Sequence, residues 1–363
     1  MLEKYAQLLV DYSLEIQPKE KLFIQSSLLA APLVKEIYRL ATRRGGIVET
    51  DIWFQGRGDI FMEEASFDEQ FDYVSNLYKE AMQHFDAYLY IRAPFEDTES
   101  KPTHLEKRKK RQLAYTPYRD IYSKRTATRE LKRSLCQYPT LATAKEAGMS
   151  LEDYTNFVYT ACNLHHEDPT AAWLKVREQQ QGVVDHLNTC SKVRYVTQRT
   201  DIEFSTKGRT WINSDGQTNM PSGEVYTSPV ENSVNGTIYF SLPSLYQGRT
   251  VRDVQLWVKD GYIEKWEASE GKDFLDEIFS LEGTRRFGEA AIGNNYNIQR
   301  ITKNILFDEK IGGTVHMAIG QSYLQAGGKN TSSVHWDMIT DMRNGGKIFA
   351  DEEKIYENGQ FLI

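Results

Sequence analysis

His335 and Asp337 lie two positions apart in the segment SVHWDM, with Trp336 between them. In an extended strand, residues two apart face the same side, so the imidazole and the carboxylate would lie together while Trp336 faces away. Imidazole and carboxylate groups are ligands for divalent cations such as zinc, cobalt and manganese. The spacing therefore indicates either a strand that carries metal ligands or a hydrogen-bonded pair with a structural role.

Three more side chains in the second half of the chain have the same chemistry: Glu224, Glu289 and His316. Each glutamate follows a glycine, which lets the backbone approach closely and orients the carboxylate without crowding. Together with His335 and Asp337 they would supply three carboxylates and two imidazoles, enough for two divalent ions with open positions for water. Taken singly, the glutamates are more typical of turns or surfaces, and His316 of a hydrogen-bonded interior histidine.

The elements that would position these side chains follow from length and composition. A chain of 363 residues exceeds what one hydrophobic core usually supports, so two domains are expected. The net charge of −7 argues against nucleic acid as the main partner. Three widely spaced cysteines support neither a disulfide framework nor a thiolate zinc site, and they fit a reducing cytoplasm. We expect no signal peptide and no membrane span, because long apolar runs are absent from the sequence.

The first part of the chain alternates between strand and helix patterns. Strand-like runs alternate with helical apolar spacing, in the order 21–27, 31–46, 47–54, 67–85 and 86–93. Repeated strand–helix–strand units predict a mostly parallel sheet covered by helices. No Gly-x-Gly-x-x-Gly follows any of these strands, so a dinucleotide site is not indicated.

The pattern changes twice after this alternation. Residues 100–190 have mostly helical spacing, and short alternating runs typical of strands follow, separated by turn sequences such as VNG and KDG. One further helix is expected within 271–286. We therefore predict an α/β domain over residues 1–188, and a strand-rich α+β catalytic domain over residues 189–363 that carries all five candidate ligands.

Two other segments contain charged or metal-binding residues. The sequence HHED at 165–168 precedes a proline at a helix start, where acidic residues favour the helix dipole, so a functional metal site there is not expected. The basic run EKRKKRQ at 106–112 is more typical of a solvated helix face than of a nucleic-acid contact in an acidic protein.

Four segments, in order, closely resemble the M29 family of metalloaminopeptidases: NMPSGEVYTSP, RRFGEAAIG, GGTVHMAIGQSY and SVHWDM. The similarity extends to GRTWINSDG, GMSLEDYTNFVYTACNL and EDPTAAW, covers most of the chain and is densest between about residues 145 and 340. The resemblance implies a site for two divalent cations and a catalytic tyrosine at Tyr323. The implied ligands are Glu224, Glu289, His316, His335 and Asp337.

The resemblance further implies a cytoplasmic homodimer whose N-terminal domain helps to enclose a cavity. The expected reaction removes N-terminal residues from peptides with a free N-terminus, through a water activated by two ions of Zn, Co or Mn. Tyr323 would stabilise the developing anionic oxygen, and Glu289 is the candidate general base. Two alternatives stay open: a metal-dependent amidase or carboxypeptidase acting on another small amide, and a non-catalytic dimeric binding protein.

Overall fold

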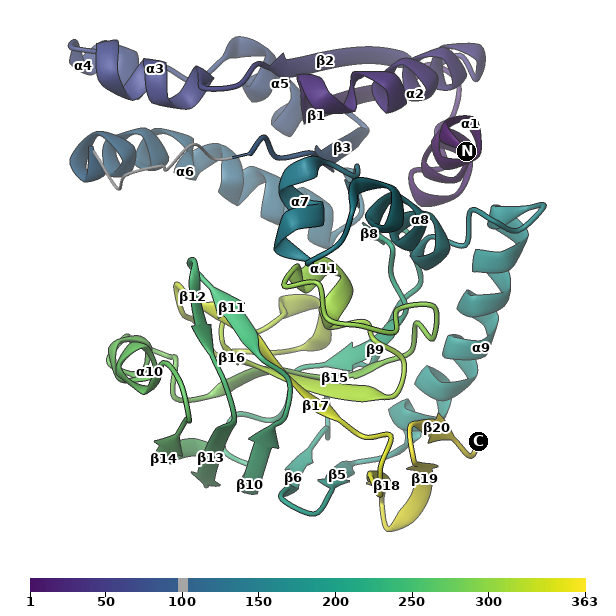
Figure 1. Cartoon of the computed structure of the whole chain (residues 1–363), viewed down its shortest axis with the longest axis vertical. Helices are drawn as coiled ribbons and strands as arrows, with labels where there is room; N and C mark the ends of the chain where they lie inside the picture. Colours follow the sequence, from purple (N-terminus) through teal and green to yellow (C-terminus); the bar gives the residue numbers. More distant parts are fainter. Residues whose placement is uncertain (97–103) are drawn as a thin grey trace. The chain divides into compact units, whose positions relative to one another are not determined.

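A computed structural model describes residues 1–96 and 104–363, and its chain forms two compact units (Figure 1). The first unit comprises Met1–Thr170 together with Gly216–Met220, and the second comprises Ala171–Asp215 together with Pro221–Ile363. The boundary predicted at 188/189 lies within helix α9 (Pro169–Thr189). That helix goes mainly with the second unit, because its apolar residues Val183, Val184 and Leu187 pack into the core of that unit.

A five-stranded parallel sheet forms the centre of the first unit. Its strand order is β2-β1-β3-β4-β8, and each neighbouring pair is parallel, as the alternating pattern predicts. The strands are β1 (Lys21–Ser27), β2 (Ile47–Trp53), β3 (Ala87–Arg92), β4 (Lys132–Gln137) and β8 (Asn219–Met220). Strand β4 lies in the region predicted as mostly helical, and β8 returns to this sheet from within the first family-like segment.

Helices surround this sheet, and one of them differs from the prediction. The helical pattern over 67–85 forms two helices, because Tyr73 is extended between them. The apolar residue Phe71 of the first helix packs with Met62, whereas Met82 of the second belongs to another cluster. The helices of the unit are α1 (Leu2–Gln7), η1 (Leu8–Ser13), η2 (Leu28–Ala30), α2 (Ala31–Arg43), α3 (Arg57–Glu64), α4 (Asp68–Asp72), α5 (Asn76–His84), α6 (Leu105–Ala127), α7 (Leu141–Glu146) and α8 (Leu151–Ala161).

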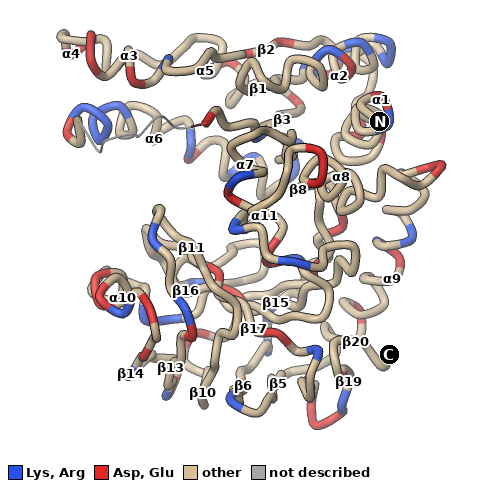
Figure 2. Tube along the Cα trace, in the orientation of Figure 1, with Lys and Arg blue, Asp and Glu red and all other residues tan. Residues whose placement is uncertain are grey.

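The basic run lies at the start of α6, where Figure 2 shows Lys and Arg concentrated. Its side chains contact neighbouring helices of the same unit. The Lys107 ammonium donates to the carbonyl oxygens of Met62 and Ala65, each at 2.8 Å, and Lys110 Nζ lies 2.7 Å from Asp68 Oδ1. No side chain of α6 is fully buried, as expected of a solvated face, and two of these cations also bind the carbonyls that end α3 and a carboxylate that begins α4.

The second unit contains two larger antiparallel sheets and a small one. The eight-stranded sheet has the order β14-β13-β10-β6-β5-β18-β19-β20, and the five-stranded sheet has the order β17-β16-β15-β9-β7. The first consists of β5 (Lys192–Val196), β6 (Asp201–Ser205), β10 (Asn235–Phe240), β13 (Val254–Lys259), β14 (Tyr262–Glu267), β18 (Lys347–Ala350), β19 (Glu353–Glu357) and β20 (Gln360–Phe361). The second consists of β7 (Ile212–Ser214), β9 (Glu224–Thr227), β15 (Phe287–Gly293), β16 (Thr314–Gly320) and β17 (His335–Asp341), and the small sheet pairs β11 (Ser244–Tyr246) with β12 (Arg249–Val251).

One hydrophobic core fills the space between the two larger sheets, and α9 and the predicted helix α10 (Lys272–Phe279) contribute to it. The KDG turn is confirmed: Asp260 and Gly261 both have positive φ and join β13 to β14. The VNG prediction is wrong, because Gly236 lies inside β10, where an added Cβ would meet the carbonyl oxygen of Asp201 at 2.1 Å. Within the described part of the chain, no helix combines the length and apolar character needed to span a bilayer.

Candidate metal centre

Four neighbouring strands of the five-stranded sheet place the five candidate ligands on one face. Side chains alternate along each strand, and one set, which includes Val225, Ile292, Met317 and Trp336, faces the shared core. The opposite face carries the polar set: Glu224 on β9, Glu289 on β15, His316 on β16 and Asp337 on β17 are buried, and His335 on β17 is partly exposed. The strand alternation predicted for His335, Trp336 and Asp337 is confirmed.

Small residues occupy the remaining positions between these side chains. Ala318 lies between Asp337 on one neighbouring strand and Glu289 on the other, and Gly293 pairs with Glu224. Ala291 pairs with His316, and all of these positions are buried. A larger side chain at these positions would fill the volume between the carboxylates and imidazoles, so the sequence of this face leaves room for ions among them.

A β-bulge at Gly288 gives Glu289 its orientation. In a regular strand Phe287 and Glu289 would face the same side, yet Phe287 packs into the core while Glu289 lies on the polar face. The pairing with β16 shifts register between these two residues, and such a bulge reverses the alternation. A Cβ on Gly288 would meet the backbone oxygen of Gln321 at 2.2 Å. Glycine is therefore required there for close backbone approach, as the Gly-Glu sequence predicts.

Substituting Gly288 with alanine is expected to lower the melting temperature by several degrees and to weaken metal binding. The added methyl group must displace the backbone of Gln321, and with it the orientation of Glu289. Thermal unfolding followed by circular dichroism, together with metal titration, measures both effects. Gly182→Ala is the matched control, because its added Cβ on the exposed face of α9 meets nothing within 4 Å. Equal melting temperatures for the two variants would contradict this account of the bulge.

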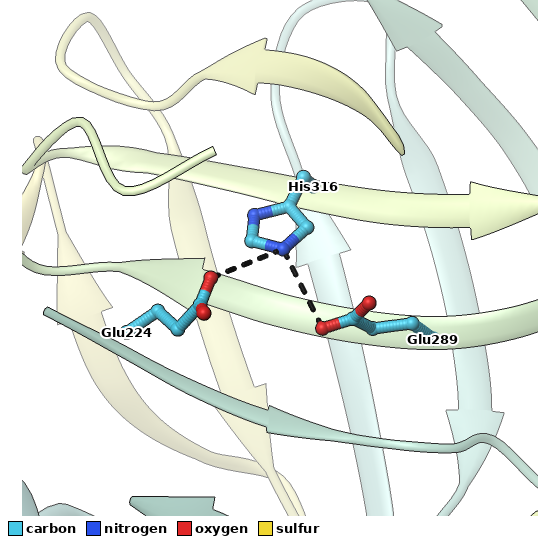
Figure 3. Close-up of side chains that lie close together, drawn as sticks. All are labelled: Glu224, Glu289 and His316. Carbon is cyan, nitrogen blue, oxygen red and sulfur yellow. Dashed lines mark ion pairs between the residues drawn. The ribbon is translucent and has the colours of Figure 1, made fainter. Parts of the chain in front are cut away.

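Glu289 lies between the two histidines. His316 Nε2 is 3.6 Å from Glu289 Oε1 and 3.5 Å from Glu224 Oε2, as Figure 3 shows. His335 Nε2 is 3.1 Å from Glu289 Oε2 and 3.6 Å from Asp337 Oδ2. Side-chain atoms that could bind a cation form three groups of three, each within 4.8 Å: Glu224–Glu289–His316, Glu289–His335–Asp337, and Glu309–His316–Asp337. The first two contain only the five candidate ligands, and these two groups share Glu289.

Hydrogen bonds outside the two groups fix His335 and Tyr323. The Nδ1–H of His335 donates to the carbonyl oxygen of Gln321 at 2.8 Å, which leaves Nε2 directed toward the carboxylates. The Tyr323 hydroxyl lies 3.3 Å from that Nε2 atom. The buried hydroxyl of Ser228 accepts from the backbone N–H of Tyr323 and donates to the carbonyl of Gly288. Ser228 thus connects the tyrosine to the bulge before Glu289.

Several buried polar atoms in this cluster have no hydrogen-bond partner among the described residues. They are Glu224 Oε2, Asp337 Oδ1 and both ring nitrogens of His316. Burying such atoms without partners is costly, and native structures rarely leave them unpaired. Glu224 Oε2 and His316 Nε2 lie 3.5 Å apart, so a divalent cation bound between these two atoms would satisfy both. The donor set therefore fits metal ions.

The electrostatics of the cluster also favour added positive charge. Burial lowers the pKa of His316, but Glu289 and Glu224 raise it more, to about 9. Burial likewise lowers the pKa of His335, while Asp337 and Glu289 raise it to about 10. Burial raises the pKa of the Asp337 carboxyl against the opposing effect of His335. Protons and metal ions thus compete for the same imidazoles, so metal binding would release protons.

The aromatic residue of the HWD sequence supports the ligand strand from behind. Trp336 is stacked on Tyr246, with ring centroids 5.0 Å apart, and contacts Phe274 at 5.5 Å. Its indole N–H donates to Ser244 Oγ, which in turn donates to the backbone oxygen of Asp337. This packing fixes β17 at Trp336, the residue between the candidate ligands His335 and Asp337.

The sequence interpretation missed three residues beside the cluster: Ser228, Glu309 and Lys310. Lys310 is fully buried, with Nζ 3.4 Å from Glu224 Oε1 and in contact with Glu309. In the sequence, FDEK precedes a glycine turn and has the composition of an exposed helix end. No local sequence pattern indicates that this lysine is buried.

The HHED segment has a different environment. His165, His166 and Glu167 are exposed. Within residues 1–96 and 104–363, the side-chain groups with metal-binding geometry all lie in the second unit and do not include this segment.

Two groups of imidazoles and carboxylates that share one carboxylate are typical of metal-dependent hydrolases. The sequence matches the family described as "Thermophilic metalloprotease (M29)" over residues 1–361. The chain therefore belongs to the M29 family of metalloproteases.

Named relatives agree with this assignment. "Aminopeptidase 2" of Geobacillus stearothermophilus is 26% identical over 93% of this chain and 91% of its own. "Aminopeptidase PepS" of Streptococcus thermophilus is 28% identical over 57% of this chain and 58% of its own. The solved structure of wild-type AmpT from Thermus thermophilus has a TM-score of 0.84 at 20% identity, over 100% of this chain and 99% of that one. That likeness shows that the two chains share a fold.

Proposed function

We propose that this chain is a metal-dependent aminopeptidase that hydrolyses N-terminal residues from peptides, using two divalent cations bound by the second unit. The observation that supports the proposal is the pair of candidate ligand groups sharing Glu289, in a chain of the M29 family whose relatives are named aminopeptidases. Glu224, Glu289 and His316 would hold one cation, and Glu289, His335 and Asp337 the other. Bound cations supply a water of lowered pKa and polarise the scissile carbonyl.

Tyr323 and Glu289 have separate roles in this proposal. Burial raises the pKa of the Tyr323 hydroxyl well above its ordinary value, and Glu289 raises it further, so the hydroxyl keeps its proton. That O–H donates a hydrogen bond to the carbonyl oxygen of the substrate as the oxygen becomes anionic. Glu289, the carboxylate between both histidines, is the proposed acceptor for the proton of the attacking water.

Three finer assignments belong to the same proposal. Mixed imidazole and carboxylate ligation suits Zn, Co or Mn, so one of these is the proposed native metal. We propose a cytoplasmic location, which the three free cysteines support. A homodimer is proposed from the family resemblance, and light scattering on the purified protein measures it. The enclosure of a cavity by the N-terminal domain stays a prediction.

Removing the metal is expected to abolish hydrolysis of leucine-p-nitroanilide, and adding Zn, Co or Mn salts is expected to restore it. Metal analysis of the dialysed protein should find two ions per chain.

A second test compares the hydrolysis rate of a peptide with that of its N-acetylated form. An aminopeptidase hydrolyses only the free form, whereas equal rates on both would identify an amidase. Full activity after exhaustive chelation, with no metal bound, would overturn the proposal.

A further inference from the structure

Lys310 is a fully buried cation beside the proposed metal site. It follows α11 (Ile305–Asp308) in a turn, where its backbone N–H donates to the carbonyl of Phe307 at 3.0 Å. Its own carbonyl accepts from the backbone N–H of Asn295 at 2.9 Å. The Asn295 side chain donates to the carbonyl of Ser222, two residues before Glu224. Backbone contacts thus hold the turn against the start of β9.

The ammonium group of Lys310 lies near one oxygen of each of two carboxylates, Glu309 and Glu224. It contacts Glu309 Oε1 and lies 3.4 Å from Glu224 Oε1. The other oxygen of Glu224, Oε2, is directed to His316 Nε2 at 3.5 Å and has no hydrogen-bond partner among the described residues. Glu309 also reaches the cluster, since one of its oxygens lies within 4.8 Å of ligand atoms of His316 and Asp337.

We propose that Lys310 is a positioning residue that holds one oxygen of Glu224 and leaves the other for a divalent cation. The inference rests on the proposed function, because it needs a cation between Glu224 and His316. A glutamate can bind a cation through one or both oxygens, and a group that occupies one oxygen fixes the choice. Partners of ligands that orient them in this way commonly contribute about 10–100-fold to metal affinity.

A role in charge compensation alone makes the opposite prediction. A buried ammonium repels nearby divalent cations, so its removal would tighten metal binding if Lys310 only balanced the charge of the carboxylates. Loss of a positioning contact weakens binding, because Glu224 is then free to adopt other rotamers. The sign of the change in metal affinity therefore separates the two roles.

The test is metal titration of the metal-free full chain against a chromophoric chelator, with Zn²⁺ and Co²⁺ as probes. Lys310→Met keeps most of the side-chain volume and removes the charge. We expect it to bind metal about 10–100-fold more weakly than the wild type at the Glu224 group, with unchanged circular dichroism. Affinity equal to or tighter than wild type would overturn the inference. A wild-type chain that binds no metal would instead overturn the proposed function.

A second variant covers the case in which Lys310→Met does not fold. Lys310→Gln removes the charge but keeps an N–H group that can donate to Glu224 Oε1, and it leaves every carboxylate of the cluster unchanged. Electrostatic compensation alone predicts tighter metal binding for Lys310→Gln than for the wild type, whereas the positioning role predicts binding that is no tighter. Failure of both variants to fold, with or without metal, would assign Lys310 to folding and contradict the inference.

Discussion

Replacing Glu289 with glutamine is expected to lower the metal content from two ions per chain to well below one. Glu289 is the residue that the two ligand groups share, so its loss weakens both. Removing a partner that only orients a ligand typically costs about 10–100-fold. Losing a shared ligand should cost more, so the turnover of leucine-p-nitroanilide should fall by more than about 10²-fold. Elemental analysis of the dialysed protein and steady-state kinetics measure the two effects.

Two comparison variants make this result specific. His335→Ala alters only the group with Glu289 and Asp337, so the chain should keep about one ion at the His316 group. Glu264→Gln changes an exposed glutamate on β14 and should leave both ions bound. A Glu289→Gln chain with two tightly bound ions would remove the case for a shared ligand.

Tyr323→Phe is expected to lower turnover by about 10²–10³-fold while metal content stays near wild type. The substitution removes a hydroxyl that stabilises charge in the transition state but is not one of the proposed ligands. The phenylalanine ring should stay in place, because it retains the ring contact with Tyr226, whose centroid is 5.1 Å away. Kinetics on aminoacyl-p-nitroanilides should therefore show a lower kcat with little change in KM.

The neighbouring tyrosine provides the matched control. Tyr226→Phe also removes one hydroxyl from the aromatic pair beside the site, and turnover should change less than about tenfold. If Tyr323→Phe keeps its turnover within threefold of wild type, the hydroxyl does not stabilise the reaction, and another donor must be sought among the residues around β16 and β17.

The local part of the site could be predicted from sequence. Strand alternation alone placed His335 and Asp337 on one face and Trp336 on the other, and these three orientations are found. The convergence of Glu224, Glu289 and His316 could not be derived that way, because it depends on how three distant strands pair. Residue chemistry named these three side chains as candidates, and the family resemblance favoured a ligand role over turn, surface or interior roles. The parallel sheet of the first unit was predictable because its strand–helix alternation repeats along the chain.

The remaining features depend on tertiary contacts that no local pattern contains. The bulge at Gly288 shifts Glu289 to the ligand face, and a regular alternation would assign it to the same face as Phe287. Lys310 has the sequence context of an exposed helix end but is buried because its turn binds Asn295. Strand β4 carries Lys132 and Arg133, whose charges conceal a strand that pairs with β3.

The path of the chain between the two units affects how the enzyme can be divided. The polypeptide passes into the second unit after Thr170, returns for Gly216–Met220, and leaves again four residues before Glu224. A fragment starting at Ala171 would contain all five proposed ligands, but its β8 segment would lack the hydrogen bonds that β4 provides. Autonomous expression of the catalytic half would thus expose an unsatisfied edge strand just upstream of a ligand. Severing or recombining the halves of this protein requires a redesigned segment at 216–220.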